Sequence, residues 1–346
     1  MQANRTDIRS LSIENLCSTL SKSNFPAYRS KQIKNWARKI DVKSFEQMSN
    51  LPKDLVSYLE TNFSLNKSKI ISHQKSSDNT VKYAIQLYDG LVIESVLIPS
   101  KDRLTACVSS QVGCSLDCNF CATSLLKRMR NLEYYEIFDQ IMLLNKEANK
   151  IFDSSITNIV FMGMGEPLMN YNNVLSSIGK ITSKSGLGIS PKRIVVSTSG
   201  IPKMIKKIAD QGVKFKLAVS LHSAIDEKRT SIMPFNDKMN RIELEEALKY
   251  WYDKTKKIIT YEYVVWEDIT DRDEDIAALV KLCKRIPCKV NLIQYNSIDD
   301  PRFSKADELW VNNYLNILKE NKVSASIRRS RGKDIQAACG QLANKH

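Results

Sequence analysis

Apolar residues in the first seventy positions recur with the period of an α-helix. Pro52 is suited to the first turn of one of these segments, because its fixed φ angle matches a helix start. The recurring residues are Ile13, Leu16, Cys17 and Leu20, then Ile33, Trp36, Ala37 and Ile40, then Leu55, Val56, Leu59 and Phe63. This spacing predicts a small helical appendage over residues 1–70.

The period then changes to two. Apolar residues alternate from Val81 to Leu87, Asp89-Gly90 favours a tight turn, and Leu91 to Ile98 form a second extended run. Alternation around a turn dipeptide is typical of a β-hairpin. We therefore expect a hairpin linker over residues 71–99.

From position 100 onward, strand-like and helix-like segments take turns. The helical segments include 134–146 and 276–283. The expected strands are Leu104–Ser109, Asn158–Met162, Arg193–Thr198, Lys216–Leu221, Ile259–Val265 and Lys289–Tyr295. Six such units predict an α/β fold, a partial β/α barrel over residues 100–300 whose functional loops follow the strand ends. A last strand, Ser324–Arg329, leads into a polar tail within a C-terminal extension over 301–346.

The charge and the hydropathy narrow the class of protein. Lys and Arg outnumber Asp and Glu by 52 to 38, a net charge of +14, which favours a polyanionic partner such as RNA or DNA. Scattered lysines that only keep the protein soluble are the alternative interpretation. No apolar run is long enough to span a bilayer, and the first residues lack the apolar core of a secretory signal, so we expect a cytoplasmic protein.

Three cysteines carry the most specific signal. Cys114, Cys118 and Cys121 have the spacing Cys-x3-Cys-x2-Cys directly after the first strand of the predicted barrel. An iron–sulfur cube normally takes four thiolate ligands, so a triplet leaves one iron open for another molecule. A structural zinc site is the alternative, and it would need a fourth ligand from elsewhere in the chain.

Other polar residues follow the later strands of the predicted barrel. Gly163-Met-Gly-Glu-Pro167 offers glycines for close backbone approach, and its Glu166 is a carboxylate suited to an ammonium group. Ser197, Ser220, His222 and Asn296 are expected at the same rim. Taken singly, each of these four has the more ordinary interpretation of a loop hydrogen-bonder.

The triplet, with Phe120 beside its last cysteine, resembles the radical S-adenosylmethionine superfamily. The resemblance implies a [4Fe-4S] cluster held by the three cysteines and S-adenosylmethionine bound at the open iron. It also implies that the cofactors supply a 5′-deoxyadenosyl radical while the protein orients them. The expected cofactor-binding residues are Gly165, Glu166, Ser197, Ser220, Leu221, His222 and Asn296.

Two further cysteines stand apart from the triplet. Cys107 lies on the strand that leads to it, and Cys339 lies in Ala-Ala-Cys-Gly-Gln-Leu near the C-terminus, just after Arg328-Arg-Ser-Arg331. Buried or tail thiols without a function are the default interpretation. Neighbouring positive charge, however, favours a nucleophilic thiolate, so Cys339 is a candidate reactive group.

Together with Glu94 in Val-Ile-Glu-Ser-Val, these motifs resemble the RlmN family of dual-specificity ribosomal and transfer RNA adenine carbon-2 methyltransferases, over residues 10–342. The resemblance implies two S-adenosylmethionine molecules per turnover, one of which methylates Cys339. It further implies that the methyl carbon adds to carbon 2 of adenine, that Glu94 accepts the carbon-2 proton, and that Cys107 releases the product by forming a disulfide with Cys339.

The same resemblance implies the partners. They are large-subunit ribosomal RNA and transfer RNA, an electron donor such as flavodoxin or ferredoxin, and no membrane. A monomer is the default expectation. The target base would be splayed out of folded RNA and its phosphates held by basic surface, to which Arg328, Arg329, Arg331 and the lysines of residues 22–39 could contribute.

Two alternatives remain open at this stage. A Cfr-type carbon-8 methyltransferase would share every catalytic residue; Pro167 and the Arg329-Ser-Arg331-Gly332 run favour the carbon-2 enzyme. A non-catalytic RNA-binding protein stabilised by zinc is an alternative of another class. The chain also has Ser124 where the family commonly has glycine, which puts the detailed shape of that loop in doubt.

Overall fold

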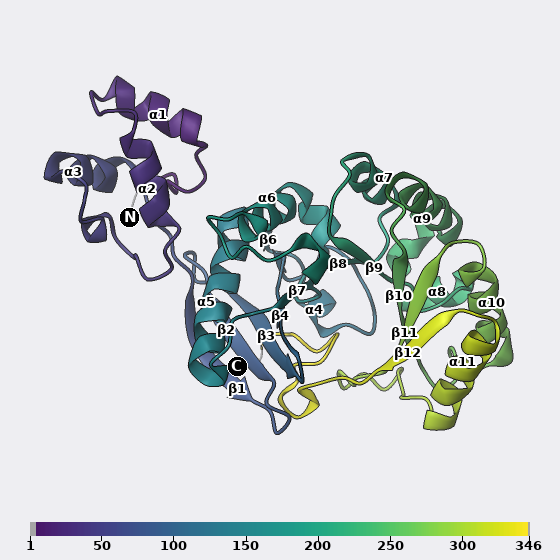
Figure 1. Ribbon diagram of the computed structural model, residues 1–346. Coiled ribbons are helices and arrows are strands. Elements are labelled where there is room, and N and C mark those ends of the chain that lie inside the picture. The colour runs from purple at the N-terminus through teal and green to yellow at the C-terminus, as the bar shows by residue number, and fades with distance from the viewer. Residues whose placement is uncertain (1–4, 345–346) are drawn as a thin grey trace.

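The computed structural model describes residues 5–344. The outermost ends of the predicted appendage and of the C-terminal extension, residues 1–4 and 345–346, lie outside the described residues. One long sheet forms the centre of the molecule, helices cover its outer side, and a group of N-terminal helices stands at one end (Figure 1).

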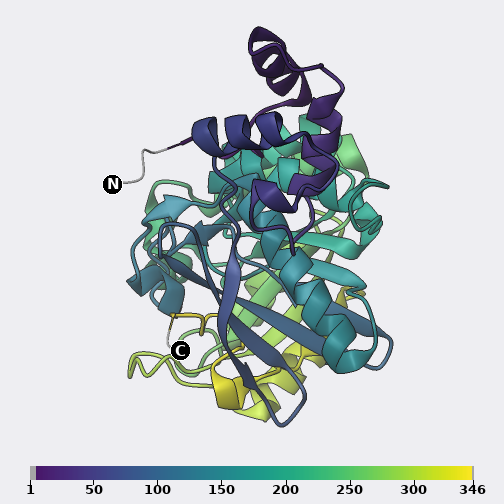
Figure 2. The ribbon, with the colours of Figure 1, turned by 90° about the vertical axis from the view of Figure 1, so that its left-hand side faces the viewer.

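The three predicted N-terminal helices are present. They are α1 (Ile13–Lys22), α2 (Arg29–Ala37) and α3 (Lys53–Asn62), with a short 3-10 turn, η1 (Phe45–Gln47). Ser12 caps α1 by accepting from the backbone N–H of Asn15. Their apolar faces pack into a hydrophobic cluster of their own, separate from the core of the sheet. Figures 1 and 2 both show these helices beyond α5 and the sheet.

The sheet has ten strands in the order β1-β2-β3-β4-β7-β8-β9-β10-β11-β12. The first four pair antiparallel, and every pair from β4 to β12 is parallel. The bounds are β1 (Lys69–Lys75), β2 (Val81–Gln86), β3 (Val92–Ser100), β4 (Arg103–Cys107), β7 (Asn158–Phe161), β8 (Ile194–Thr198), β9 (Lys216–Ser220), β10 (Ile259–Val265), β11 (Cys288–Gln294) and β12 (Ser324–Arg328). The six predicted barrel strands are therefore confirmed, and the barrel stays open because β1 and β12 form its two edges.

A helix connects each parallel strand to the next, as parallel pairing requires. These helices are α5 (Tyr134–Phe152), α6 (Tyr171–Thr182), α7 (Pro202–Asp210), α8 (Asp226–Ile232), α9 (Arg241–Thr255), α10 (Asp273–Cys283) and α11 (Glu308–Glu320). Shorter elements are β5 (Gln111–Val112), α4 (Ala122–Leu125), β6 (Arg130–Asn131) and the 3-10 turns η2 (Pro167–Asn170), η3 (Pro191–Arg193), η4 (Pro234–Asp237) and η5 (Lys333–Ile335). None of the helices among the described residues is long and apolar enough to cross a membrane.

The predicted hairpin is part of a larger antiparallel unit. The strand β1 precedes it and was not predicted, because its residues are mostly exposed and show no apolar alternation. In β2 the sequence alternates, yet the structure buries all of Val81–Ile85. Both faces of β2 are therefore covered, and the polar residue Lys82 lies inside the protein.

Candidate active site

A cavity opens where the parallel strands end. Its walls come from the loops after the strands, the end of β12 and the C-terminal tail, and its empty space is about 1060 Å³ including the open mouth. This is the end of a β/α barrel that carries functional loops. The predicted site residues that line it are Cys114, Cys118, Cys121, Gly165, Glu166, Ser197, Ser220, His222, Asn296 and Cys339. Three other predicted residues, Glu94, Cys107 and Leu221, are buried outside the lining.

The cysteine triplet occupies a tight loop between β5 and α4. Gly113 begins it with φ +75°, and a Cβ atom there would lie 2.1 Å from the carbonyl oxygen of Lys127. Only glycine fits this close approach of two backbones. At the other end, the N–H of Cys121 donates to the carbonyl of Cys118 over 3.2 Å. The loop thereby turns all three thiols toward the cavity.

The three thiols oppose one another's ionisation. Burial raises the pKa of Cys114 to about 12, and the charge of Cys121 adds to that effect. Burial and the two neighbouring cysteines likewise raise the pKa of Cys118. A positively charged metal group displaces thiol protons and reverses this balance, so the triplet suits such a group.

Two kinds of metal group could use a cysteine triplet, a single ion or an iron–sulfur cluster. Within residues 5–344, no group of three or more His, Cys, Asp or Glu side chains is placed to hold one metal ion. A zinc ion needs its ligands around a single point, whereas an iron–sulfur cube takes each thiolate at a different iron. Cys114, Cys118 and Cys121 all line the cavity, and three thiolates would leave one iron of such a cube open.

The loop after β7 presents a buried carboxylate. Glu166 accepts from the backbone N–H of Ser199 over 2.7 Å and from that of Leu168 over 3.0 Å. Burial raises its pKa, and these N–H groups oppose the rise by stabilising the ionised form. Gly165 has φ +92°, and a Cβ atom there would lie 2.5 Å from Cβ of Gln111. The glycine lets the loop come close enough to place Glu166 in the wall.

An unsatisfied acceptor lies across the cavity. Asn296 donates from Nδ2 to the carbonyl of Cys339 over 3.2 Å, while its Oδ1 is buried and has no hydrogen-bond partner. An unpaired buried oxygen is costly, and an amine or hydroxyl of a bound ligand would satisfy it. Ser197 and Ser220 line the same space. These residues and Glu166 therefore fit S-adenosylmethionine, whose amino and hydroxyl groups are donors.

The ring of His222 is held in place by neighbouring residues of the protein. It takes a left-handed backbone conformation with φ 59°, and its Nδ1 accepts from the N–H of Val264 over 3.2 Å. Its ring packs edge-on against Phe120, with the centroids 4.9 Å apart. Burial lowers the pKa of His222 to about 3, so the ring is neutral near pH 7 and has no acid–base role there.

The C-terminal tail crosses the cluster loop and brings Cys339 into the cavity. The carbonyl of Gly340 accepts from the N–H of Ala122 over 2.7 Å, and that of Leu342 accepts from Thr123 Oγ1 over 2.6 Å. Figure 1 shows the tail, in yellow, running from β12 back toward β3 and β4. Cys339 is exposed and lines the same cavity as the triplet.

Cys107 lies just behind this wall at the end of β4. Burial and, to a smaller extent, the charge of Cys339 raise its pKa to about 12, while the charge of Arg328 opposes this rise. Arg328 itself pairs with Glu262 over 3.3 Å. The two thiols therefore lie close enough to influence each other, with one guanidinium beside both. All eight cysteines are free.

Glu94 is fully buried on the far side of the tail from the cavity. Its Oε2 accepts from the N–H groups of Ala343 over 2.8 Å and Asn344 over 3.0 Å. Lys82 Nζ lies 3.1 Å from Oε1. The tail thus separates the carboxylate from the open space.

One residue behind the site escaped the sequence analysis. Arg229 is fully buried and donates to the carbonyls of Ser199 over 2.6 Å and Leu221 over 3.2 Å. Burial lowers its pKa to about 10, while the charge of Cys118 opposes this change. Its run Asp226–Thr230 has the composition of a solvated helix, so the sequence carries no signal of this role.

Comparison with known proteins gives consistent matches. The sequence profile of the Radical SAM superfamily matches residues 108–280. The "Probable dual-specificity RNA methyltransferase RlmN" of Flavobacterium johnsoniae is 58% identical over 345 residues, 100% of this chain and 99% of that protein. The protein of the same name in Flavobacterium psychrophilum is 57% identical with the same coverage. The crystal structure of a radical SAM methyltransferase from Sphaerobacter thermophilus has a TM-score of 0.89 and 35% identity, covering 97% of this chain and 99% of that one.

Proposed function

The chain belongs to the RlmN family of radical S-adenosylmethionine RNA methyltransferases, and we propose that it transfers a methyl group to carbon 2 of adenine through Cys339. The observation that carries the proposal is the meeting of two separate thiol systems. The triplet and Cys339 share one cavity although more than two hundred residues separate them in the sequence. Cys107 lies behind the same wall.

The first thiol system holds the cofactors. Cys114, Cys118 and Cys121 would ligate a [4Fe-4S] cluster, and Glu166 and Asn296 would hold the amino acid end and the hydroxyls of S-adenosylmethionine. When bound, the two cofactors supply a radical able to remove a hydrogen atom from a methyl group. The protein orients them and excludes water from the cavity.

The second thiol system carries the methyl group. Cys339 receives it from one S-adenosylmethionine, so a turnover that also uses the radical consumes two molecules. The methyl carbon then bonds to carbon 2 of the adenine, and Glu94 accepts the carbon-2 proton. The Cys107 thiolate attacks the sulfur of Cys339, and the sulfur–carbon bond breaks with its electron pair going to the carbon, which takes up a proton to become the methyl group. A disulfide forms as the methylated adenine leaves, and the bound redox cofactor would take up the one electron left over from the radical addition.

The substrates and partners follow from the same proposal. They are large-subunit ribosomal RNA and transfer RNA, with flavodoxin or ferredoxin as the class of electron donor. A reductant must also reopen the Cys107–Cys339 disulfide after each turnover. We place the enzyme in the cytoplasm as a monomer. The net charge of +14 supports binding to RNA phosphates.

Mass spectrometry of the tail peptide tests the covalent route. Enzyme isolated without oxygen and incubated with S-adenosylmethionine should carry a methyl or methylene group on Cys339. The Cys339→Ala variant should lack both the adduct and methyl transfer, whereas Cys17→Ala, which removes a cysteine of the appendage, should retain both. Unmodified Cys339 in active, freshly isolated enzyme would refute the route.

A further inference from the structure

The carboxylate of Glu94 is held in an unusual state for a proton acceptor. It has no exposed surface, its Oε2 is occupied by two backbone N–H groups, and its Oε1 accepts no hydrogen bond. A buried carboxylate without compensation takes up a proton, which would prevent it from accepting another. An opposite charge beside the carboxylate would offset the cost of its burial.

Two of its partners belong to a segment that has to move. Ala343 and Asn344 lie four and five residues beyond Cys339. Leu342, which directly precedes them, lines the cavity. Adenine can reach Oε2 of Glu94 only when this segment withdraws, because the N–H groups of Ala343 and Asn344 occupy that oxygen. The two N–H groups are then lost at the moment when the carboxylate must act.

Lys82 stays in place because the sheet holds it. It lies on β2, which pairs with β1 on one side and β3 on the other. Lys82 is opposite Val96, two residues along β3 from Glu94, so both side chains share one face of the sheet. Val96 is in turn opposite Cys107 of β4, which places that thiol on the same face.

The pair is isolated from water and from other charges. The side chains of Lys82 and Glu94 are 4% and 0% exposed, and their charged atoms lie 3.1 Å apart. Within residues 5–344 this is the only ion pair of either side chain. The other groups at Glu94 are uncharged: Met164 Sδ accepts from its N–H, and Ser109 Oγ donates to its carbonyl.

We propose that Lys82 is a positioning residue for catalysis, which stays beside Oε1 and stabilises the carboxylate of Glu94, so that Oε2 is free to take the carbon-2 proton once the tail has withdrawn. This inference rests on the proposed function, in which Glu94 is the acceptor. In the step itself the carbon–hydrogen bond breaks, its electron pair stays with the adenine, and the proton bonds to Oε2. Lys82 remains beside Oε1 and stabilises the carboxylate before the transfer.

The test compares three single variants of the full-length, cluster-loaded enzyme. Lys82→Met removes the charge with little change of volume, and Lys82→Arg keeps the charge. Lys75→Met removes an exposed lysine from the neighbouring strand β1 and is the matched control. Each variant is assayed for methyl transfer from pH 6 to 9 with RNA carrying hydrogen or deuterium at carbon 2, and its melting temperature is measured.

The expected result is a specific change in the pH profile. Methyl transfer by Lys82→Met should fall at least tenfold at pH 7 and rise by about tenfold per pH unit, because Glu94 must first lose a proton. Deuterium at carbon 2 should slow this variant more than the wild type. Lys82→Arg should recover most of the activity, and Lys75→Met should match the wild type.

A second readout does not depend on turnover. Infrared difference spectra against Glu94→Gln should show the band of a protonated carboxylic acid at pH 7 in Lys82→Met and that of a carboxylate in the wild type. An ionised Glu94 in Lys82→Met, or a loss of activity that is equal at every pH, would overturn the inference.

The proposed function can fail separately from this inference. If Cys339 is never methylated, or if Glu94→Gln retains full activity, the proposed route itself is wrong. If Cys339 is methylated and Glu94→Gln is inactive, but Lys82→Met keeps the wild-type profile, only the role of Lys82 is wrong.

Discussion

At the scale of single residues, two cysteines with the same exposed fraction differ in the groups that surround their thiols. Cys107 and Cys283 are both 7% exposed; burial raises the pKa of Cys107, whereas a hydrogen bond with Cys288, followed by burial, raises that of Cys283. Only Cys107 has a guanidinium beside it, that of Arg328, which lowers its pKa. The difference fits a thiol that must ionise for one step of the reaction.

The charge of Arg328 should therefore control the reactivity of Cys107. Because the pKa of Cys107 is about 12, its thiolate fraction and its alkylation rate should rise about tenfold per unit between pH 7 and 9. In Arg328→Met the rate at Cys107 should fall roughly threefold or more, while the rate at Cys283 stays the same. Peptide mass spectrometry of cluster-free, reduced protein measures both sites, and an equal effect on the two would contradict the assignment.

At the scale of elements, the ends of the barrel strands could be predicted from the sequence, whereas the buried contacts behind the site could not. The six barrel strands follow from their apolar runs, and the polar residues after them do meet at one rim. Lys82 falls between apolar alternating positions, which indicates an exposed side chain, yet all of Val81–Ile85 is buried, so both faces of β2 are covered. The contact between Glu94 and Ala343 spans 249 residues, a separation that no local pattern can reveal.

Arg229 of α8 should stabilise the ends of β8 and β9. Arg229→Leu removes a buried guanidinium and its hydrogen bonds to the carbonyls of Leu221 and of partly buried Ser199, so the free energy of unfolding should fall by about 3 kcal/mol. The matched control is Arg285→Leu, which breaks a half-exposed ion pair with Glu245 and should cost less than about 1 kcal/mol. Chemical denaturation measures both values. Equal losses in the two variants would show that Arg229 does not support the strand ends.

At the scale of the molecule, buried ion pairs fasten the appendage to the core. Arg9 contacts Asp7 over 3.0 Å and Asp139 of α5 over 2.7 Å, and Lys67 lies 3.6 Å from Asp139. Beside this network, a second cavity lies between α2 and the helices α5 and α6. Burial and the charge of Lys180 lower the pKa of Lys34 to about 8 against the opposing charge of Asp7, so the two lysines lie close enough to influence each other.

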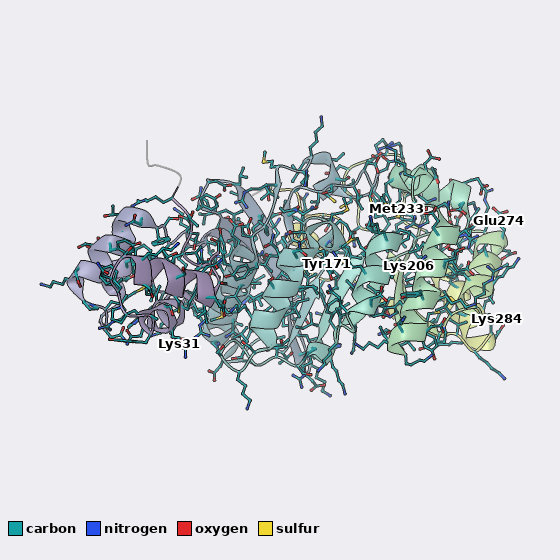
Figure 3. All side chains as sticks on the ribbon, turned by 90° about the horizontal axis from the view of Figure 1, so that it is seen from above. Lys31, Tyr171, Lys206, Met233, Glu274 and Lys284 are labelled. Atoms are coloured by element: carbon teal, nitrogen blue, oxygen red, sulfur yellow. The ribbon has the colours of Figure 1, made fainter. Side chains whose placement is uncertain are left out.

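This cavity should contribute to RNA binding. Replacing both Lys34 and Lys180 by Gln should weaken binding to RNA about tenfold at low salt and lower the salt dependence by about one ion per lysine. The matched control replaces Lys281 of α10 and Lys284, which directly follows that helix, by Gln. Figure 3 shows Lys284 at the opposite end of the molecule from Lys31 of α2. Fluorescence anisotropy measures the RNA affinity of both double variants. An equal loss of affinity in both would mean that lysine charge contributes to binding wherever it lies on the surface.

The position of the methyl group on the RNA product shows whether the enzyme methylates carbon 2 of adenine through Cys339. Enzyme with its cluster is incubated with ribosomal RNA, reductant and S-adenosylmethionine that carries a deuterated methyl group, and the RNA is digested to nucleosides for mass spectrometry. We expect labelled 2-methyladenosine with the wild-type enzyme and none with the Cys339→Ala variant. Labelled 8-methyladenosine, or 2-methyladenosine formed by Cys339→Ala, would contradict it.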